Sequence, residues 1–267
     1  MKPQISIILS THNNETTIKE AVSSILMQTF RNFEFIIVND ASTDKTLQIL
    51  KKIKDRRIKI ISNKKRQGLT KSLNFALKVI KANIIARMDA DDIAHPKRLK
   101  TQFDYLQKNP KIALCGSWVE LIDGNDQKIK VKKFPTSSVE IKSKILKFNP
   151  FIHSSIMFKK SIVKRIGAYN NNFRFAQDYE FLLRVASKFL TSNIPRPLLK
   201  YRLPSLKSIS VKNLKNQEKF ALKARLLALT KYNYPKWQAL FLIKPMISYL
   251  IPAKIKLSIY KFFWNKR

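Results

Sequence analysis

The feature that most constrains this chain is an alternation, through its first third, of short apolar runs with segments of helical spacing. Four runs rich in Ile, Val and Phe lack a strict apolar–polar alternation, which is typical of strands buried on both faces. Three intervening segments carry apolar residues three or four positions apart, as amphipathic helices do. The expected strands are residues 5–10, 33–38, 58–61 and 84–89, and the expected helices are residues 15–28, 42–50 and 69–80. This order predicts an α/β fold with a mostly parallel, doubly wound sheet.

Three of these strands end in polar residues. Thr11 follows the first strand, Asp40 follows the second, and Asp89 and Asp91 end the fourth. Because the carboxyl ends of parallel strands meet at one edge of a sheet, we expect these side chains to share a single crevice. The chain has neither a Gly-x-Gly-x-x-Gly fingerprint nor a P-loop, so phosphate must be held in another way.

Three carboxylates crowd into four residues at Asp89, Asp91 and Asp92. They repel one another unless a cation lies between them, and Mg²⁺ and Mn²⁺ prefer carboxylate oxygens together with substrate phosphates. Asp89 and Asp91 point the same way in an extended chain, so we expect both to face the ion. The alternative is a polar turn that caps a helix beginning at Pro96, with Asp92 as its N-terminal charge.

Beyond residue 110 the pattern changes to mixed strands and short helices. A hairpin is expected over residues 112–134, followed by a helix at 138–148, a strand at 156–158 and a helix from 177. From Lys212 onward the chain is basic and apolar, with Glu218 as its only acid. Its lysines and aromatic residues predict an amphipathic segment in the plane of an anionic membrane surface. The alternative is an ordinary helical subdomain packed on the core.

The charge of the chain indicates an anionic partner. Lys and Arg number 53 against 17 Asp and Glu, a formal net charge of +36. The basic residues are spread along the whole chain without a nucleic-acid-binding motif, so we favour a membrane surface and a phosphate-bearing ligand over nucleic acid. Cys115 is the only cysteine, and the first residues lack the apolar segment of a signal peptide. Both features favour the cytoplasm.

In their order, these motifs resemble the inverting family 2 glycosyltransferases. The segments that carry the resemblance are residues 6–13, 38–44, 86–92 and 177–178, with the sequences SIILSTHN, VNDASTD, ARMDADD and QD. The resemblance implies a GT-A fold, which is Rossmann-like, over residues 1–210. Its donor half would occupy about residues 1–110 and its acceptor half about residues 111–210, followed by a basic helical extension over residues 211–267.

The resemblance also implies a nucleotide-sugar donor, expected to be a UDP-sugar, and Mn²⁺ or Mg²⁺ as cofactor. Asp40 matches the family's base-recognising Asp, and Thr11 matches a second nucleoside contact. Asp89 resembles the ribose- and metal-side member of the DxD signature, and Asp91 resembles the direct metal ligand. Asp178 matches the catalytic base, which removes a proton from the acceptor hydroxyl as its oxygen attacks the anomeric carbon. Each of these residues also has a purely structural alternative. Thr11 would be a plain loop residue, Asp40 a helix cap, and Asp178 a negative charge that stabilises a helix N-terminus.

Weaker matches surround these positions. Arg66 and Lys71 match donor-contacting positions of the family loosely and Asn74 matches better, with a solvated basic face as an equal alternative. His153 lies in a segment that resembles the acceptor-side loop, although a core or loop histidine fits as well. Arg98 and His95, beside the metal loop, are expected on a helix surface, with a phosphate contact as the alternative.

Two further expectations concern the late part of the domain. Glu180, in the first turn of the helix from residue 177, is expected to be solvated. Many relatives carry a His shortly after a late Tyr-Arg pair, and residues 201–204 have none, which leaves a third protein ligand of the metal open.

Taken together, these features predict a metal-dependent inverting glycosyltransferase of cell-surface polysaccharide synthesis, peripheral on the inner face of the membrane. Its acceptor would be a glycan or a lipid-linked saccharide, such as one carried on polyprenyl diphosphate. The alternative is a non-catalytic polyanion- or nucleic-acid-binding protein, or a degenerate transferase scaffold, neither of which needs Asp40, Asp91 and Asp178. A nucleotidyltransferase would share the metal chemistry but leave Asp178 unexplained.

Overall fold

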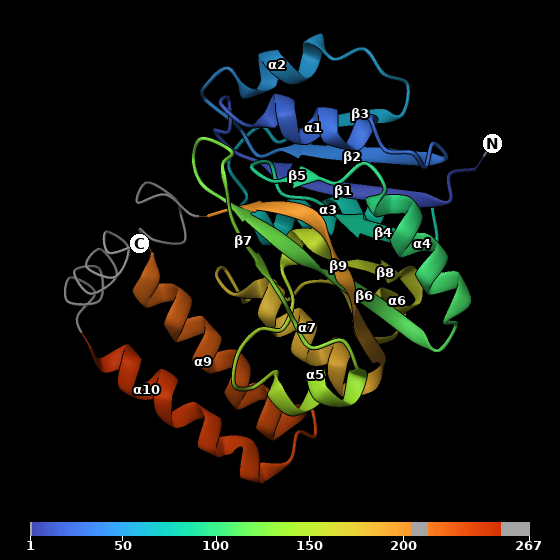
Figure 1. Ribbon diagram of the computed structural model, residues 1–267. Helices are drawn as coiled ribbons and strands as arrows, with labels where there is room; N and C mark the ends of the chain where they lie inside the picture. The colour runs from blue at the N-terminus through green and yellow to red at the C-terminus, as the bar shows by residue number, and fades with distance from the viewer. Residues whose placement is uncertain (1, 204–212, 252–267) are drawn as a thin grey trace.

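A single mixed sheet organises the computed structural model, which describes residues 2–203 and 213–251. The strand order is β3-β2-β1-β4-β8-β6-β9-β5, with β7 paired to β6 at the side (Figure 1). Side chains alternate along β1 between two apolar cores, because Ile8 packs into one core whereas Ile7 and Leu9 pack into the other. The strand is therefore buried on both faces, as its unbroken apolar run predicts.

The first half of the sheet is parallel. β1 pairs in parallel with β2 and β4, and β2 pairs in parallel with β3. The elements are β1 (Ile5–Thr11), α1 (Ile18–Leu26), β2 (Phe33–Asn39), α2 (Thr46–Lys52), β3 (Ile58–Ser62), α3 (Leu69–Val79) and β4 (Ile84–Arg87). The predicted alternation of four strands and three helices is confirmed.

The second half of the sheet is mixed. β8 lies antiparallel between β4 and β6, β9 runs parallel to β6, and β5 pairs antiparallel with β9. The elements are β5 (Ile93–Ala94), α4 (Arg98–Lys108), β6 (Ile112–Ile122), β7 (Lys128–Lys132), α5 (Ser138–Lys144), η1 (His153–Ser155), β8 (Met157–Lys159), α6 (Lys160–Ile166), α7 (Gln177–Lys188) and β9 (Leu190–Arg202). Parallel pairing thus dominates only the first half, because the predicted β6–β7 hairpin and β8 reverse the chain direction in the second.

The C-terminal helices pack on the side of α7. They are α9 (Leu214–Lys231), the 3-10 helix η2 (Lys236–Leu242) and α10 (Ile243–Leu250). Figure 1 shows α9 between α7 and α10. No helix among residues 2–203 and 213–251 is long and apolar enough to cross a bilayer. The expected start of the extension and its aromatic end, from Ile255 to Trp264, fall outside the described residues.

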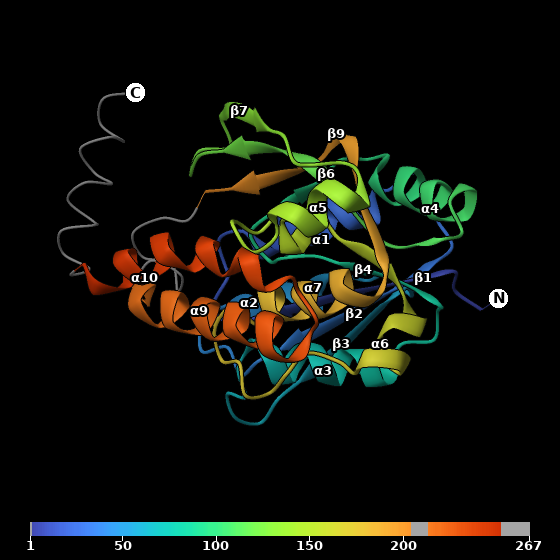
Figure 2. The same cartoon turned by 90° about the horizontal axis from the view of Figure 1, so that it is seen from below.

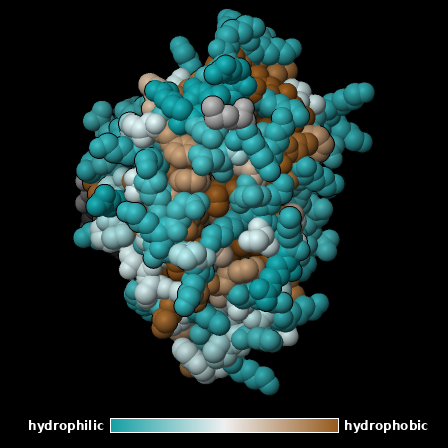
Figure 3. All heavy atoms as spheres, turned by 90° about the vertical axis from the view of Figure 1, so that its right-hand side faces the viewer, coloured by the Kyte–Doolittle hydropathy of each residue, from teal (hydrophilic) through white to brown (hydrophobic). Residues whose placement is uncertain are grey.

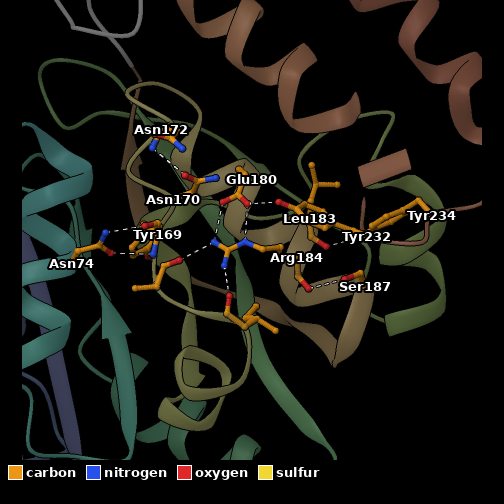
Figure 4. Close-up of polar contacts among 12 residues, drawn as sticks. Asn74, Tyr169, Asn170, Asn172, Glu180, Leu183, Arg184, Ser187, Tyr232 and Tyr234 are labelled. Carbon is orange, nitrogen blue, oxygen red and sulfur yellow. Dashed lines mark hydrogen bonds and ion pairs between the residues drawn. The ribbon is translucent and has the colours of Figure 1, made fainter. Parts of the chain in front are cut away.

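Glu180 joins α7 to this helical layer, which corrects the expectation that it is solvated. Its side chain is fully buried, pairs with Arg184 Nε at 2.7 Å and accepts a hydrogen bond from Tyr232 Oη at 2.6 Å (Figure 4). Tyr232 immediately follows α9, so the acid finds one partner on its own helix and one on another. The face of the molecule on the side of the amino terminus is mostly hydrophilic (Figure 3).

Candidate active site

The carboxyl ends of β1, β2 and β4 bring the predicted residues to one edge of the sheet. Thr11 pairs with Asn39 in the β1–β2 register, and the Asp40 amide donates to the Thr11 carbonyl at 2.8 Å. On the other side of β1, the Met88 amide donates to the Ile8 carbonyl at 3.0 Å. β2 and β4 flank β1, so two strand spacings of about 4.8 Å separate the strand that leads to Asp40 from the strand that leads to Asp89.

Asp40 is a buried carboxylate held by the loop that precedes α3. One oxygen accepts from Asn63 Nδ2 at 2.7 Å and from the Gln67 amide at 2.8 Å, and the other accepts from the Gly68 amide at 2.8 Å. Burial alone would raise the pKa of Asp40, but these hydrogen bonds outweigh it and lower the pKa. Asp40 is therefore an ionised acceptor that also shapes the loop. Thr11 is buried beside it and donates to Asn14 Oδ1 at 2.9 Å.

Asp89, Asp91 and Asp92 form a compact acidic cluster just beyond β4. One carboxylate oxygen from each lies within 4.8 Å of the others. Asp92 is buried, accepts from the Ser154 hydroxyl and accepts from the Arg202 amide at 2.9 Å. It therefore anchors the loop to η1 and to the end of β9. The alternative of Asp92 as a helix N-terminal charge is wrong, because α4 begins at Arg98 after an N-cap at Lys97.

The electrostatics of this cluster fit a divalent cation. Although the Asp91 side chain reaches solvent, desolvation by the surrounding atoms, followed by the charge of Asp89, raises the pKa of Asp91 to about 6. Burial and the charge of Asp91 raise the pKa of Asp92 well above its usual range. A bound cation would relieve this repulsion, and a donor set made only of carboxylate oxygens suits Mg²⁺ or Mn²⁺. Asp91 and Asp89 are the members whose oxygens are not both engaged in hydrogen bonds.

A buried arginine at the end of β4 lies beneath the cluster. Arg87 is 1% exposed and forms an ion pair with Asp89, while its Nε has no hydrogen-bond partner among the described residues. Burial alone would lower the pKa of Arg87, but the charge of Asp89 and its hydrogen bond raise the pKa overall.

A second buried guanidinium, that of Arg98, lies next to Arg87. Arg98 Nη2 donates to the Arg87 carbonyl at 2.7 Å, and its Nε donates to Gln102 Oε1 at 3.0 Å. Burial lowers the pKa of Arg98 to about 10. The expectation that Arg98 lies on a helix surface is wrong, because its guanidinium finds these acceptors in the interior.

Asp178 lies in the first turn of α7, near enough to the end of β4 for the charges of Arg87 and Asp89 to act on its carboxylate. It is half-buried, lies 3.5 Å from Asn149 Nδ2, and follows Ala176, which has a positive φ of 51°. Burial raises the pKa of Asp178, the charge of Arg87 lowers it and the charge of Asp89 raises it. Because both charges act on Asp178, the catalytic candidate and the acidic cluster share one electrostatic environment.

His153 is half-buried beside these groups. Its Nε2 lies 2.8 Å from Tyr169 Oη, and burial lowers the pKa of His153 well below its usual range. The ring is therefore neutral, as expected for the core-histidine alternative.

The remaining predicted positions lie around α3. Asn74 binds the backbone of Tyr169 twice, donating to its carbonyl at 2.8 Å and accepting from its amide at 3.0 Å (Figure 4). Lys71 is exposed and lines a groove of about 740 Å³ whose described lining residues include none of the site's acids. Arg66 is exposed in the loop that caps Asp40. The structure thus brings Thr11, Asp40, Asp89, Asp91 and Asp178 to the edge, whereas Lys71 faces the groove.

The roles of several residues that support the candidate site were not predicted. They are the buried Arg87, the three residues that donate hydrogen bonds to Asp40, and Arg202. Arg202 Nε donates to the Asp91 carbonyl at 2.9 Å, and its guanidinium also pairs with Asp126 and Glu20. It therefore fastens the acidic loop to the end of β9. The sequence did contain a signal for a buried ion pair at Arg87, because it is the one charged residue in an apolar strand that ends beside three acids.

Comparison with known proteins identifies the family. The model of Glycosyl transferase family 2 matches residues 6–167. The chain belongs to glycosyltransferase family 2. This glycosyltransferase is 37% identical over 228 residues to an uncharacterized glycosyltransferase of Haemophilus influenzae, covering 81% of this chain and 70% of that protein.

Two Escherichia coli relatives have more specific names. The O-antigen biosynthesis glycosyltransferase WbnJ is 34% identical over 208 residues, covering 74% of this chain and 79% of WbnJ. A UDP-Gal:alpha-D-GlcNAc-diphosphoundecaprenol beta-1,3-galactosyltransferase is 30% identical over 192 residues, covering 68% of this chain and 67% of that enzyme.

Among solved structures, residues 1–349 of Staphylococcus aureus TarS in complex with UDP align with a TM-score of 0.69. The sequence identity is 18%, and the alignment covers 91% of this chain and 70% of that one. This likeness confirms the predicted GT-A fold.

Proposed function

We propose that this glycosyltransferase transfers a sugar from a nucleotide-sugar, most simply a UDP-sugar, to a saccharide acceptor with inversion at the anomeric carbon. The observation that carries the proposal is the convergence of Asp40, the acidic cluster and Asp178 on one sheet edge from separate parts of the chain. A protein that only bound polyanions would gain nothing from gathering carboxylates there.

The nucleoside would lie against the ends of β1 and β2. Asp40 is ionised and rigidly held, so its lone pairs can accept from an N–H of the base, and Thr11 lies beside it. Arg66, in the loop that caps Asp40, and Lys71, one turn into α3, would add positive charge towards the diphosphate. Both lysine and arginine side chains are long enough to rearrange when a ligand binds.

Asp91 and Asp89 would hold Mn²⁺ or Mg²⁺ at the end of β4. An ion held there supplies Lewis-acid neutralisation of the charge that develops on the leaving diphosphate. Arg87 keeps the Asp89 carboxylate in place from below, and Asp92 keeps the loop in place through Ser154 and Arg202. The chain itself therefore fixes the ligand positions.

Asp178 would act as the general base. Its carboxylate accepts the proton of an acceptor hydroxyl while that oxygen attacks the anomeric carbon from the face opposite the diphosphate, which inverts the configuration. Its half-buried position excludes bulk water from one side, and its raised pKa makes it a stronger base than a solvated Asp.

The acceptor class follows from the charge of the chain and from its relatives. We propose a glycan or a lipid-linked saccharide, such as one carried on polyprenyl diphosphate, in the synthesis of a cell-surface polysaccharide at the inner face of the membrane. The names of the two Escherichia coli relatives support this class, and the net charge of +36 suits a membrane rich in anionic lipid.

The test is UDP release across a panel of UDP-sugars with Mn²⁺, for wild type, Asp91→Asn and Asp178→Asn. We expect Asp91→Asn to lose Mn²⁺-dependent donor binding, and Asp178→Asn to keep donor binding but lose transfer. Asp104→Asn, which changes an exposed acid on α4, is the matched control and should behave as wild type. Full transfer by Asp178→Asn would contradict the proposed base.

A further inference from the structure

The last helix that the structure describes, α10, presents its apolar side outward. Four large apolar side chains, Ile243, Met246, Ile247 and Leu250, are 53–78% exposed, and no residue of α10 is buried. Their spacing of three and four residues places them on one face. From η2, Trp237 and Leu240 are exposed to a similar degree, at 58% and 66%; we call these six residues the apolar strip.

The opposite side of the helix carries its polar contact. Ser248 Oγ donates to Glu218 Oε1 on α9 at 2.8 Å, and the buried Leu242 precedes the first turn. In Figure 1, α9 lies between α10 and α7, so α10 is the outermost of the described helices on this side. A helix that faces water on its outer side normally has the reverse polarity, with its apolar face turned inward.

Exposed lysines accompany the apolar strip. Lys236 and Lys244 are exposed within the same segment, and α9, which packs against α10, carries the exposed Lys215 and Lys219. Between residues 213 and 251 the only acid is Glu218, which is engaged by Ser248. Any partner that covers the strip therefore meets several cations and needs compensating anions.

We propose that the apolar strip docks into the headgroup region of a bilayer that contains anionic phospholipid. Apolar side chains enter the boundary between headgroups and acyl chains, while the flanking lysines meet lipid phosphates. A second copy of the same face would oppose lysine to lysine, and a neutral protein partner would leave the cations uncompensated. The lipid surface satisfies both parts of the chemistry.

The position of the strip suits an enzyme that works on a lipid-linked saccharide. The parallel strands run from the side of the amino terminus, at the right of Figures 1 and 2, towards the left, and α10 ends on that left side too. The acidic edge and the end of the strip thus lie on one side of the molecule. Access to a lipid-linked acceptor from this side rests on the proposed function, whereas the docking of the strip on a bilayer does not.

The test is flotation of the full chain with vesicles of phosphatidylcholine, with and without one-third phosphatidylglycerol. We expect wild type to float with the anionic vesicles and to be released by high salt. Each buried methylene contributes about 0.8 kcal/mol, or about fourfold, so replacing a large apolar side chain by Ser should lower the partition coefficient at least about tenfold. The variant Met246→Ser/Ile247→Ser/Leu250→Ser should therefore lose roughly 1,000-fold or more.

A matched control separates this surface from general hydrophobicity. Ile129, Val139 and Leu190 are equally exposed apolar residues on other elements, and the variant Ile129→Ser/Val139→Ser/Leu190→Ser should float as wild type does. A loss below threefold in the α10 variant, or an equal loss in the control, overturns the proposal. So does a wild-type dimer in sedimentation velocity that the α10 variant abolishes.

Donor hydrolysis separates the two proposals. Without vesicles, the α10 variant should hydrolyse the UDP-sugar at the wild-type rate, because none of its substitutions lies at the acidic edge. If flotation succeeds and no UDP-sugar is hydrolysed by wild type, the proposed function fails and the docking surface stands. The reverse result removes only the docking surface.

Discussion

Arg87 places a full positive charge beneath the acids of the site. Burying a guanidinium is costly unless a counter-charge accompanies it, and Asp89 supplies that charge directly. The neighbouring Arg98 cannot help as a counter-ion, because it is a cation bound to the Arg87 carbonyl. Asp89 therefore lies between two cations: it neutralises the buried Arg87 and would also bind the proposed metal.

The first prediction concerns the pH dependence of transfer. Asp178 must be deprotonated to accept a proton, and burial raises its pKa, so kcat/KM should fall on the acid side at a pH above the ordinary Asp range near 3.9. The measurement is a pH profile of transfer at saturating Mn²⁺. Asp178→Asn should lower kcat by about 10²–10⁴-fold and abolish this limb. An unchanged limb in the variant would assign it to another group.

The second prediction tests the charge of Arg87. Its positive charge lowers the pKa of Asp178, so Arg87→Met should raise that pKa and move the acid limb of the profile to higher pH. Arg87→Lys keeps the charge and should leave the limb near its wild-type position, even if kcat falls. Equal profiles for the Met and Lys variants would show that Arg87 acts through packing alone.

At the scale of elements, α7 is the helix that connects the reaction to the rest of the fold. Its first turn carries both Asp178 and Glu180. The Glu180 carboxylate binds Arg184 on the same helix and Tyr232, which follows α9. Arg184 also donates to the carbonyls of Ile166 and Ala168, at the end of α6 and in the loop that follows. The helix that carries the proposed base is therefore fixed by a buried ionic network rather than by apolar packing alone.

The third prediction is a stability change in that network. Glu180→Gln leaves the Arg184 guanidinium without its counter-charge in the interior, and we expect a loss of about 3 kcal/mol in the free energy of unfolding. Asp104→Asn removes an i, i+4 pair of similar geometry that is exposed, and should change stability by less than about 0.5 kcal/mol. Urea denaturation measures both values, and equal losses would contradict the importance of burial.

The elements that could be predicted were those whose signals are local. The strands β1 and β2 are continuous apolar runs, and α1 and α3 have regular apolar spacing, so neighbouring residues were enough. β9 was not predicted over its length, because Pro195 and Pro197 interrupt a segment that otherwise reads as a strand. The β6–β9 pairing accommodates them through register shifts near Trp118, which only the partner strand reveals.

The candidate site shows the same division. Asp40, Asp91 and Asp178 were found because the order of their motifs resembles the family, and the alternation of strands and helices predicts that the first two share an edge. Arg98 and Glu180 were misplaced on the surface because their partners, the Arg87 carbonyl and Tyr232, are brought to them by the fold. A charged residue with a distant interior partner has no local signature.

At the scale of the whole molecule, an excess of positive charge surrounds a small group of carboxylates. The 17 acids are far fewer than the 53 basic residues, yet three of them occupy the loop after β4. A positive field of this kind attracts nucleoside diphosphates and lipid phosphates to the protein, while the acidic cluster would bind a cation. Donor and cation are therefore expected to bind together.

The fourth prediction follows from that joint binding. UDP and Mn²⁺ together, at about 100 times their dissociation constant, should stabilise the fold by about 2.7 kcal/mol. For a chain of this size the rise in Tm is roughly 5–10 °C. Each ligand alone should give less, and Asp91→Asn should remove the joint effect in a thermal-shift experiment. Stabilisation by single-stranded DNA with no response to UDP and Mn²⁺ would contradict this view.

One helix spans the distance between the two ends of the candidate site. The cap of α3 is held by Asp40 through Gln67 and Gly68, and its flank grips the loop before α7 through Asn74 and Thr70. Gly68 adopts a φ of 90°, a conformation that side chains resist. A side chain at Gly68 would meet open space but would strain this backbone, and any shift of α3 that relieves the strain would reach the loop that leads to Asp178. We would then expect a lower rate of transfer, although Gly68 and Asp178 are far apart in the sequence.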